Sequence, residues 1–112
     1  MTTSVARKVE SIKKRASISS SNIAQLVGTT PQTLSRWSTG KHEPQREHLE
    51  RLLTLDYVAE QLSEFFEPAD VKMWLFAPHP ELSGSRPADL LAQGRLDDVL
   101  AVIERLRDSA YA

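Results

Sequence analysis

The stretch "TTPQTLSRWSTGK", residues 29–41, decides how the sequence around it folds. Thr30 can cap a helix of about two turns whose first position is Pro31, where a missing N–H costs no hydrogen bond. Leu34 and Trp37 fall on the inner face of this helix. Its outward face has hydrogen-bonding side chains, one cation and no acid: Gln32, Ser35, Arg36 and Thr39. That face is a candidate contact surface.

The residues before this stretch predict a second short helix. Ser19 can cap a helix over residues 20–27, and Gly28 permits the left-handed conformation that often ends a helix. The two helices would be joined by Gly28-Thr29-Thr30, with Ile23 and Val27 facing Leu34 and Trp37, which is the spacing of a helix-turn-helix. The alternative is a helical hairpin with a solvated polar face.

The second helix of a DNA-binding helix-turn-helix lies in the major groove, where its outward face contacts base edges. Gln32 can pair with adenine, and Arg36 can donate two hydrogen bonds to guanine. Side chains at the ends of the helix suit phosphates, which position a protein without reading sequence. The candidate DNA-binding residues are Thr30, Gln32, Thr33, Ser35, Arg36, Thr39 and Lys41.

Helical spacing of apolar residues recurs along the whole chain and no stretch alternates as a strand would, so the predicted fold class is all-α. The longest helix, over about residues 45–66, has an apolar stripe wider than one neighbour needs, and we expect a homodimer to form through it. Leu82 is expected to anchor the Pro- and Gly-bearing loop 78–87. The other expected helices are one capped by Ser4, one opened by Pro68 that ends in "MWLFA", and two over about 87–93 and 96–108.

The charge is divided unevenly between the two halves of the 112-residue chain. Residues 1–48 have eight cations and three acids, net +5, whereas residues 49–112 have six cations and twelve acids, net −6. A basic half joined to an acidic half indicates two partners of different character, one of them nucleic acid. We therefore predict a DNA-binding region over 1–48, a connecting helix over 49–66 and a second binding region over 67–112.

Several classes of function are disfavoured by composition. The chain has no cysteine, which excludes disulfides and thiolate metal sites. The apolar runs are too short for a membrane span and the first residues lack a signal core, so a cytoplasmic protein is expected. His42 and His48 lack the spacing of a helical zinc pair, and His79 is read as a surface residue. We predict no metal, no cofactor and no enzyme activity.

Two longer stretches resemble a known family. "TLSRWSTGKHEP", residues 33–44, resembles the second helix and following loop of Xre-type helix-turn-helix regulators, except that Ser38 stands where many relatives have Glu. "WLFAPHPELSGSRPADLLAQGRLDDVLAVIERL", residues 74–106, resembles the C-terminal domain of the Xre/MbcA/ParS antitoxins. The positions in register there are Trp74, Leu75, Pro78, Leu82, Gly84, Pro87, Leu90, Leu91, Gly94 and Val99.

The resemblance implies an antitoxin whose partner is a RES-domain toxin that destroys NAD. It implies that the antitoxin covers the active-site cleft of the toxin, within a larger toxin–antitoxin assembly, and represses the shared operon by binding operator DNA. The acidic second half would then dock on the toxin through the loop, the last helix and the tail. The candidate toxin-binding residues are Pro78, Leu82, Arg86, Arg107, Tyr111 and Ala112. The alternative is a repressor whose second half only dimerises.

Overall fold

Helices are the only regular elements in the part of the protein that the structure, a computed structural model, describes: residues 3–111 without the side chain of Tyr111. The predicted all-α class is therefore confirmed. No helix in this range is long and apolar enough to cross a membrane. In chain order the helices are α1 (Ser4–Ala16), α2 (Ser20–Val27), α3 (Pro31–Ser38), α4 (Arg46–Ser63), α5 (Pro68–Phe76), the 3₁₀ helix η1 (Pro80–Leu82), α6 (Pro87–Ala92) and α7 (Leu96–Tyr111).

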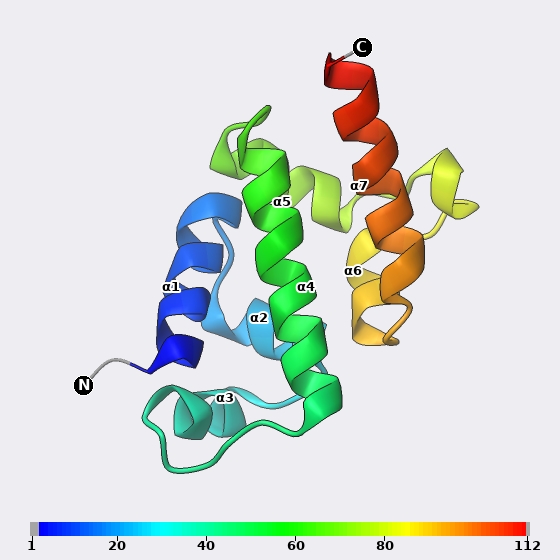
Figure 1. Cartoon of the computed structure of the whole chain (residues 1–112). Helices are drawn as coiled ribbons and strands as arrows, with labels where there is room; N and C mark the ends of the chain where they lie inside the picture. The colour runs from blue at the N-terminus through cyan, green and yellow to red at the C-terminus, as the bar shows by residue number, and fades with distance from the viewer. Residues whose placement is uncertain (1–2, 112) are drawn as a thin grey trace.

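The longest helix, α4, runs through the middle of the molecule and contacts helices from both ends of the chain (Figure 1). It packs mainly against α1, α2 and α7 and also touches α5 and α6, which in turn pack directly on α1 and α2. Its buried side chains are Leu52, Leu55, Val58, Ala59 and Leu62, and they belong to one continuous apolar core that extends from Val5 to Ile103. The two oppositely charged halves of the sequence therefore share a single hydrophobic core.

Two expectations for α4 were wrong. The helix ends at Ser63 and does not reach Phe66: the N–H groups of Glu64 and Phe65 bond three residues back, to the carbonyls of Gln61 and Leu62, which tightens the last turn. The wide apolar stripe is also not left open for self-association, because α1, α2 and α7, with smaller contributions from α5 and α6, cover most of it. Of the large apolar side chains on this helix, Leu53 is exposed, at 42%.

The helix starts follow the predicted capping residues with one exception. Ser19 and Thr30 accept hydrogen bonds from the backbone N–H groups of Asn22 and Thr33, as expected. At α1, however, the cap is Thr3 and not Ser4: the Thr3 hydroxyl oxygen accepts from the N–H of Ala6 at 3.0 Å. The same hydroxyl donates to the carbonyl of Ser38 at 2.8 Å, so it also ties the start of α1 to the end of α3.

The shared core predicts that the whole chain unfolds in one step. Leu55→Ala removes a fully buried side chain of α4 and should lower the free energy of unfolding by about 2–5 kcal/mol. The control Met73→Ala, which truncates a 66% exposed apolar side chain on α5, should cost less than about 1 kcal/mol. Urea unfolding followed by circular dichroism measures both. Two separate transitions, or equal losses for the two variants, would contradict a core that spans the chain.

Candidate functional site

The first candidate surface is formed by α2, α3 and the tight turn between them. Gly28 has a left-handed backbone, φ +83°, and its N–H donates to Gln25 while the N–H of Thr29 donates to the carbonyl of Ala24 at 2.8 Å. This geometry turns the chain sharply, and a side chain at Gly28 would be strained. Leu34 and Trp37 of α3 then point into the core, where they are 2% and 4% exposed.

Burial of one face of α3 leaves the predicted contact residues on the other. Thr30, Gln32, Ser35, Arg36, Thr39 and Lys41 are exposed and Thr33 is half-buried. The Thr30 hydroxyl donates to that of Thr33 at 3.1 Å, and the Thr39 hydroxyl donates to the carbonyl of Arg36 at 3.2 Å. Within residues 3–111 neither Arg36 nor Lys41 is joined to an acid, so both charges face solvent.

A hollow of about 290 Å³ lies beside α3, between it and the start of α4. Its wall includes Arg36, Trp37 and His48. The His48 ring lies 5.5 Å from that of Trp37, centroid to centroid, so α4 supports α3 from behind. Sequence reasoning missed this contact, because it weighed His48 only as a metal ligand. In the described part of the chain, no three acidic, His or Cys side chains are grouped as a metal site would need.

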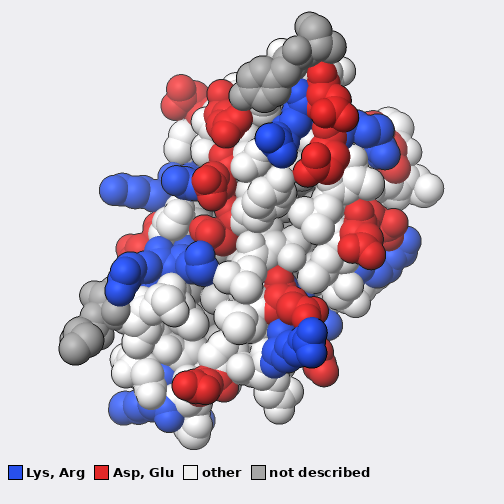
Figure 2. All heavy atoms as spheres, viewed as in Figure 1, with Lys and Arg blue, Asp and Glu red and all other residues white. Residues whose placement is uncertain are grey.

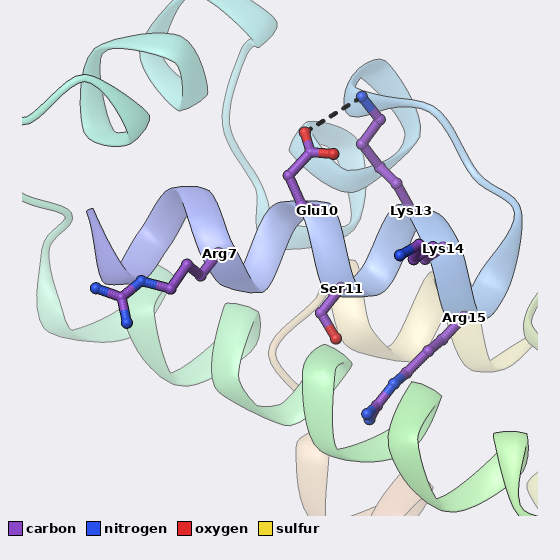
Figure 3. A pocket seen from close by; sticks show the side chains of 6 residues that line it. All are labelled: Arg7, Glu10, Ser11, Lys13, Lys14 and Arg15. Atoms are coloured by element: carbon purple, nitrogen blue, oxygen red, sulfur yellow. Dashed lines mark ion pairs between the residues drawn. The ribbon is translucent and has the colours of Figure 1, made fainter. Parts of the chain in front are cut away.

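The cations of α1 are partly engaged by acids of the other half. Lys8 pairs with Asp56 at 3.4 Å and Arg15 with Glu60 at 3.6 Å, which joins α1 to α4. On the outer side of α1, around a hollow of about 580 Å³, Lys13 pairs with Glu10 at 3.7 Å (Figure 3). The ion pairs between α1 and α4 therefore neutralise, within the molecule, part of the charge asymmetry from which we predicted two partners.

The remaining acids gather away from α3. Figure 2 shows acidic side chains concentrated over the upper part of the molecule, around the ends of α4, α5 and α7, and few near the lower end where α3 lies. An open hollow of about 380 Å³ between α4 and α7 is lined by Leu53, Tyr57 and Leu100, among others. These two surfaces, one acidic and one apolar, are the candidate partner surfaces of the second half.

The loop 78–87 is organised by His79. Its Nε2 lies 2.8 Å from the carbonyl of Trp74, which can only accept, so Nε2 carries the proton and donates. Its ring lies 4.9 Å from the Trp74 ring, and its own carbonyl accepts from the N–H groups of Leu82 and Gly84. The expectation that His79 is merely a surface residue was therefore wrong, because it is half-buried and its ring contacts both the carbonyl and the ring of Trp74.

The predicted toxin-binding residues differ in how accessible they are. Pro78 and Arg86 are exposed, whereas Leu82 is buried at 8% and anchors the loop, as its other predicted role required. Arg86 donates to both carboxylate oxygens of Asp89, at 2.7 and 2.9 Å. These hydrogen bonds lower the pKa of the Asp89 carboxyl below its usual value and raise that of the Arg86 guanidinium.

The last helix continues through most of the predicted tail. It reaches Tyr111 and not about residue 108. Arg107 donates to the hydroxyl of Tyr57 at 3.3 Å and pairs with Glu104 at 3.8 Å, so it fixes α7 to α4. The side chain of Tyr111 and the whole of Ala112 lie outside the described residues.

Comparison with known proteins connects these surfaces to a family. Residues 61–108 match the family described as the antitoxin Xre/MbcA/ParS C-terminal toxin-binding domain. The chain is 30% identical, over 107 residues, to the mycobacterial cidal antitoxin MbcA of Mycobacterium tuberculosis, covering 96% of this chain and 95% of MbcA. A probable mycobacterial cidal antitoxin of the same organism is 34% identical over 90 residues, 80% of this chain and 76% of that protein.

The fold gives the same result. The structure matches a chain of the crystal structure of the M. tuberculosis MbcT–MbcA toxin–antitoxin complex with a TM-score of 0.79 and 29% identity, covering 98% of this chain and 99% of that one. The protein is therefore the antitoxin of a toxin–antitoxin pair. It belongs to the Xre/MbcA/ParS antitoxin family, and the predicted family resemblance is confirmed.

Proposed function

We propose that this antitoxin neutralises a RES-type, NAD-degrading toxin and represses its own operon through the helix-turn-helix formed by α2 and α3. The observation that carries the first part is similarity to MbcA along nearly the whole chain, 96% of it. The toxin class follows from the resemblance alone. Operator DNA and NAD are both present in the cytoplasm, so we propose that the protein acts there.

The exposed face of α3 supports the DNA-binding part. It offers amide and hydroxyl groups with one arginine, a set suited to base edges, and it has no acid that phosphates would repel. Arg36 and Lys41 have no acidic partner within the described residues, so neither must break an ion pair to bind DNA. Arg36 would read a base and Lys41 would neutralise a phosphate.

These two roles predict different effects on operator binding. Arg36→Ala should weaken specific binding by about 1–3 kcal/mol and relax the choice of base, whereas Lys41→Ala should weaken binding to all sequences alike and lower the salt slope by about one. Gel shifts or fluorescence anisotropy with the promoter fragment and a scrambled duplex, at several salt concentrations, measure both. Unchanged operator affinity in Arg36→Ala would mean that α3 does not read the DNA.

A dimer is part of the proposal, because one helix-turn-helix reads only a half-site. With most of the α4 stripe covered, the hollow around Leu53 and Leu100 is the apolar surface we assign to self-association. Leu53→Asp should shift the protein toward the monomer in sedimentation velocity at micromolar concentration, with Met73→Asp as a control at another exposed apolar residue. A parent protein that sediments as a monomer, with and without DNA, would rule out this dimer.

Charge supports docking of the second half on the toxin. A cleft that binds the phosphates of NAD must be positive near its mouth, and the acidic end of this antitoxin would be attracted to it. Since α7 extends to Tyr111, the tail would enter the cleft as the end of a helix. Pro78 and Arg86 would lie at the rim, and Leu82 would act by shaping the loop.

The tail is expected to exclude NAD directly. Deleting residues 108–112 removes the last turn of α7, where Asp108, Ser109 and Ala110 are exposed. The truncated antitoxin should still co-purify with the toxin and bind the operator, yet NAD should be consumed in the mixture. The control is Arg105→Ala, an exposed change on the same helix that keeps the tail. Complete protection of NAD by the truncated chain would show that inhibition comes from elsewhere.

A further inference from the structure

Arg51, on α4, lies at the point where the ends of two other helices meet. Its Nη1 donates to the carbonyl of Ala92, at the end of α6, at 3.2 Å. A Cβ on Gly28, at the end of α2, would collide with the same Nη1. A Cβ on Gly94, after α6, would lie 3.0 Å from Nη2 and 3.4 Å from Nε. One guanidinium thus fills the space left by two missing side chains, one in each half of the chain.

The two helix ends that meet at Arg51 are built alike. At α2, the N–H groups of Gly28 and Thr29 close the last turn; at α6, those of Gly94 and Arg95 do so, with Arg95 donating to Leu90 at 2.9 Å. Both glycines are left-handed, with φ +83° and +77°. A cation at such carbonyl-rich ends is favourable, and within residues 3–111 no carboxylate pairs with Arg51.

We propose that Arg51 is a positioning residue that fixes the α2–α3 pair against the toxin-binding domain. The contacts that carry this lie one after another along α4: His48 touches Trp37 of α3, and Arg51, one turn later, bridges the end of α2 to α6. α2 and α6 also pack directly on each other; Arg51 adds a contact at the turn that leads into α3, and we expect it to carry a displacement of α6 to that turn. This rests on the proposed function only for its consequence, which is that toxin and operator binding are linked through Arg51.

The shared contact can be tested without toxin or DNA. Gly28→Ala, Gly94→Ala and their combination are made in the parent and in Arg51→Ala, and urea unfolding is measured. The control is Gly84→Ala, because Gly84 has φ +83° and no atom within 4 Å of its missing Cβ, so it reports backbone strain alone. In the parent, Gly28→Ala should raise the unfolding equilibrium constant several-fold more than the control, because Nη1 must move from the Ala92 carbonyl. Gly94→Ala, whose contact with the guanidinium is looser, should exceed the control by a smaller factor. The combination should do less than the product of the two, because both displace one guanidinium.

In the Arg51→Ala background, Gly28→Ala and Gly94→Ala should each raise the unfolding equilibrium constant no more than Gly84→Ala does. Their combination should then raise it by the product of the two single factors. An excess that persists without the guanidinium would overturn the proposal, because the cost would then come from the backbone. If Gly28→Ala does not fold, the comparison of Gly94→Ala with Gly84→Ala in the two backgrounds decides the question alone.

Amide exchange tests transmission between the halves, which a purely local packing role would not alter. The N–H of Thr29 closes α2, far along the chain from Gly94. Gly94→Ala should speed its exchange by about twofold or more in the parent, under conditions in which global unfolding is rarer than local opening. Gly84→Ala should not, and neither should Gly94→Ala when Arg51 is alanine. Unchanged Thr29 exchange in the parent background would overturn the proposal, whatever the operator and toxin assays give.

Discussion

The arrangement of the two halves depends on the packing of α4 against helices that come before and after it in the chain. Its buried side chains contact α1 and α2, which come before it, and α5, α6 and α7, which come after it. The two halves also pack on each other directly, α1 on α5 and α2 on α6, so α4 and these helix pairs together close one core. The surface of α3 and the acidic end of the molecule therefore keep a fixed relation, although the sequence regions that form them carry opposite charge.

The ion pairs between α1 and α4 change the distribution of surface charge but contribute little to the free energy of unfolding. Lys8–Asp56 and Arg15–Glu60 are partly exposed, and such pairs contribute about 0–1 kcal/mol each. They do, however, remove two cations and two acids from the surfaces that partners can meet. The basic character left near α3 comes from Arg36 and Lys41, which face solvent at the surface we assign to DNA.

Helix ends and turns could be predicted from the sequence, because they depend on neighbouring residues. Contacts between residues far apart in the chain could not. Gly28 ends α2 through its left-handed backbone, and Ser19 and Thr30 begin α2 and α3 through their hydroxyls, so the turn before α3 was predicted correctly. The burial of Trp37 and Leu82 was predicted correctly too. The coverage of the α4 stripe was missed, because periodicity reveals how wide an apolar face is but not how many helices lie on it. The roles of His79 and Arg51 depend on atoms brought together only by folding, namely the Trp74 carbonyl and the space at two glycines. The assignments of α3 to DNA and of the tail to the toxin stay predictions.

We propose that one chain carries two activities on different surfaces: toxin neutralisation in the second half and DNA reading in α3. The test is the growth of cells that express the proposed RES-type partner toxin together with an antitoxin carrying Gln32→Ala and Arg36→Ala. The antitoxin is expressed from a promoter that the pair does not control. Both side chains are exposed, so the fold should survive their loss. We expect this variant to rescue growth fully and to preserve NAD, although it no longer binds the operator. Cell death at normal antitoxin levels would contradict this proposal, because neutralisation would then require the DNA-reading helix.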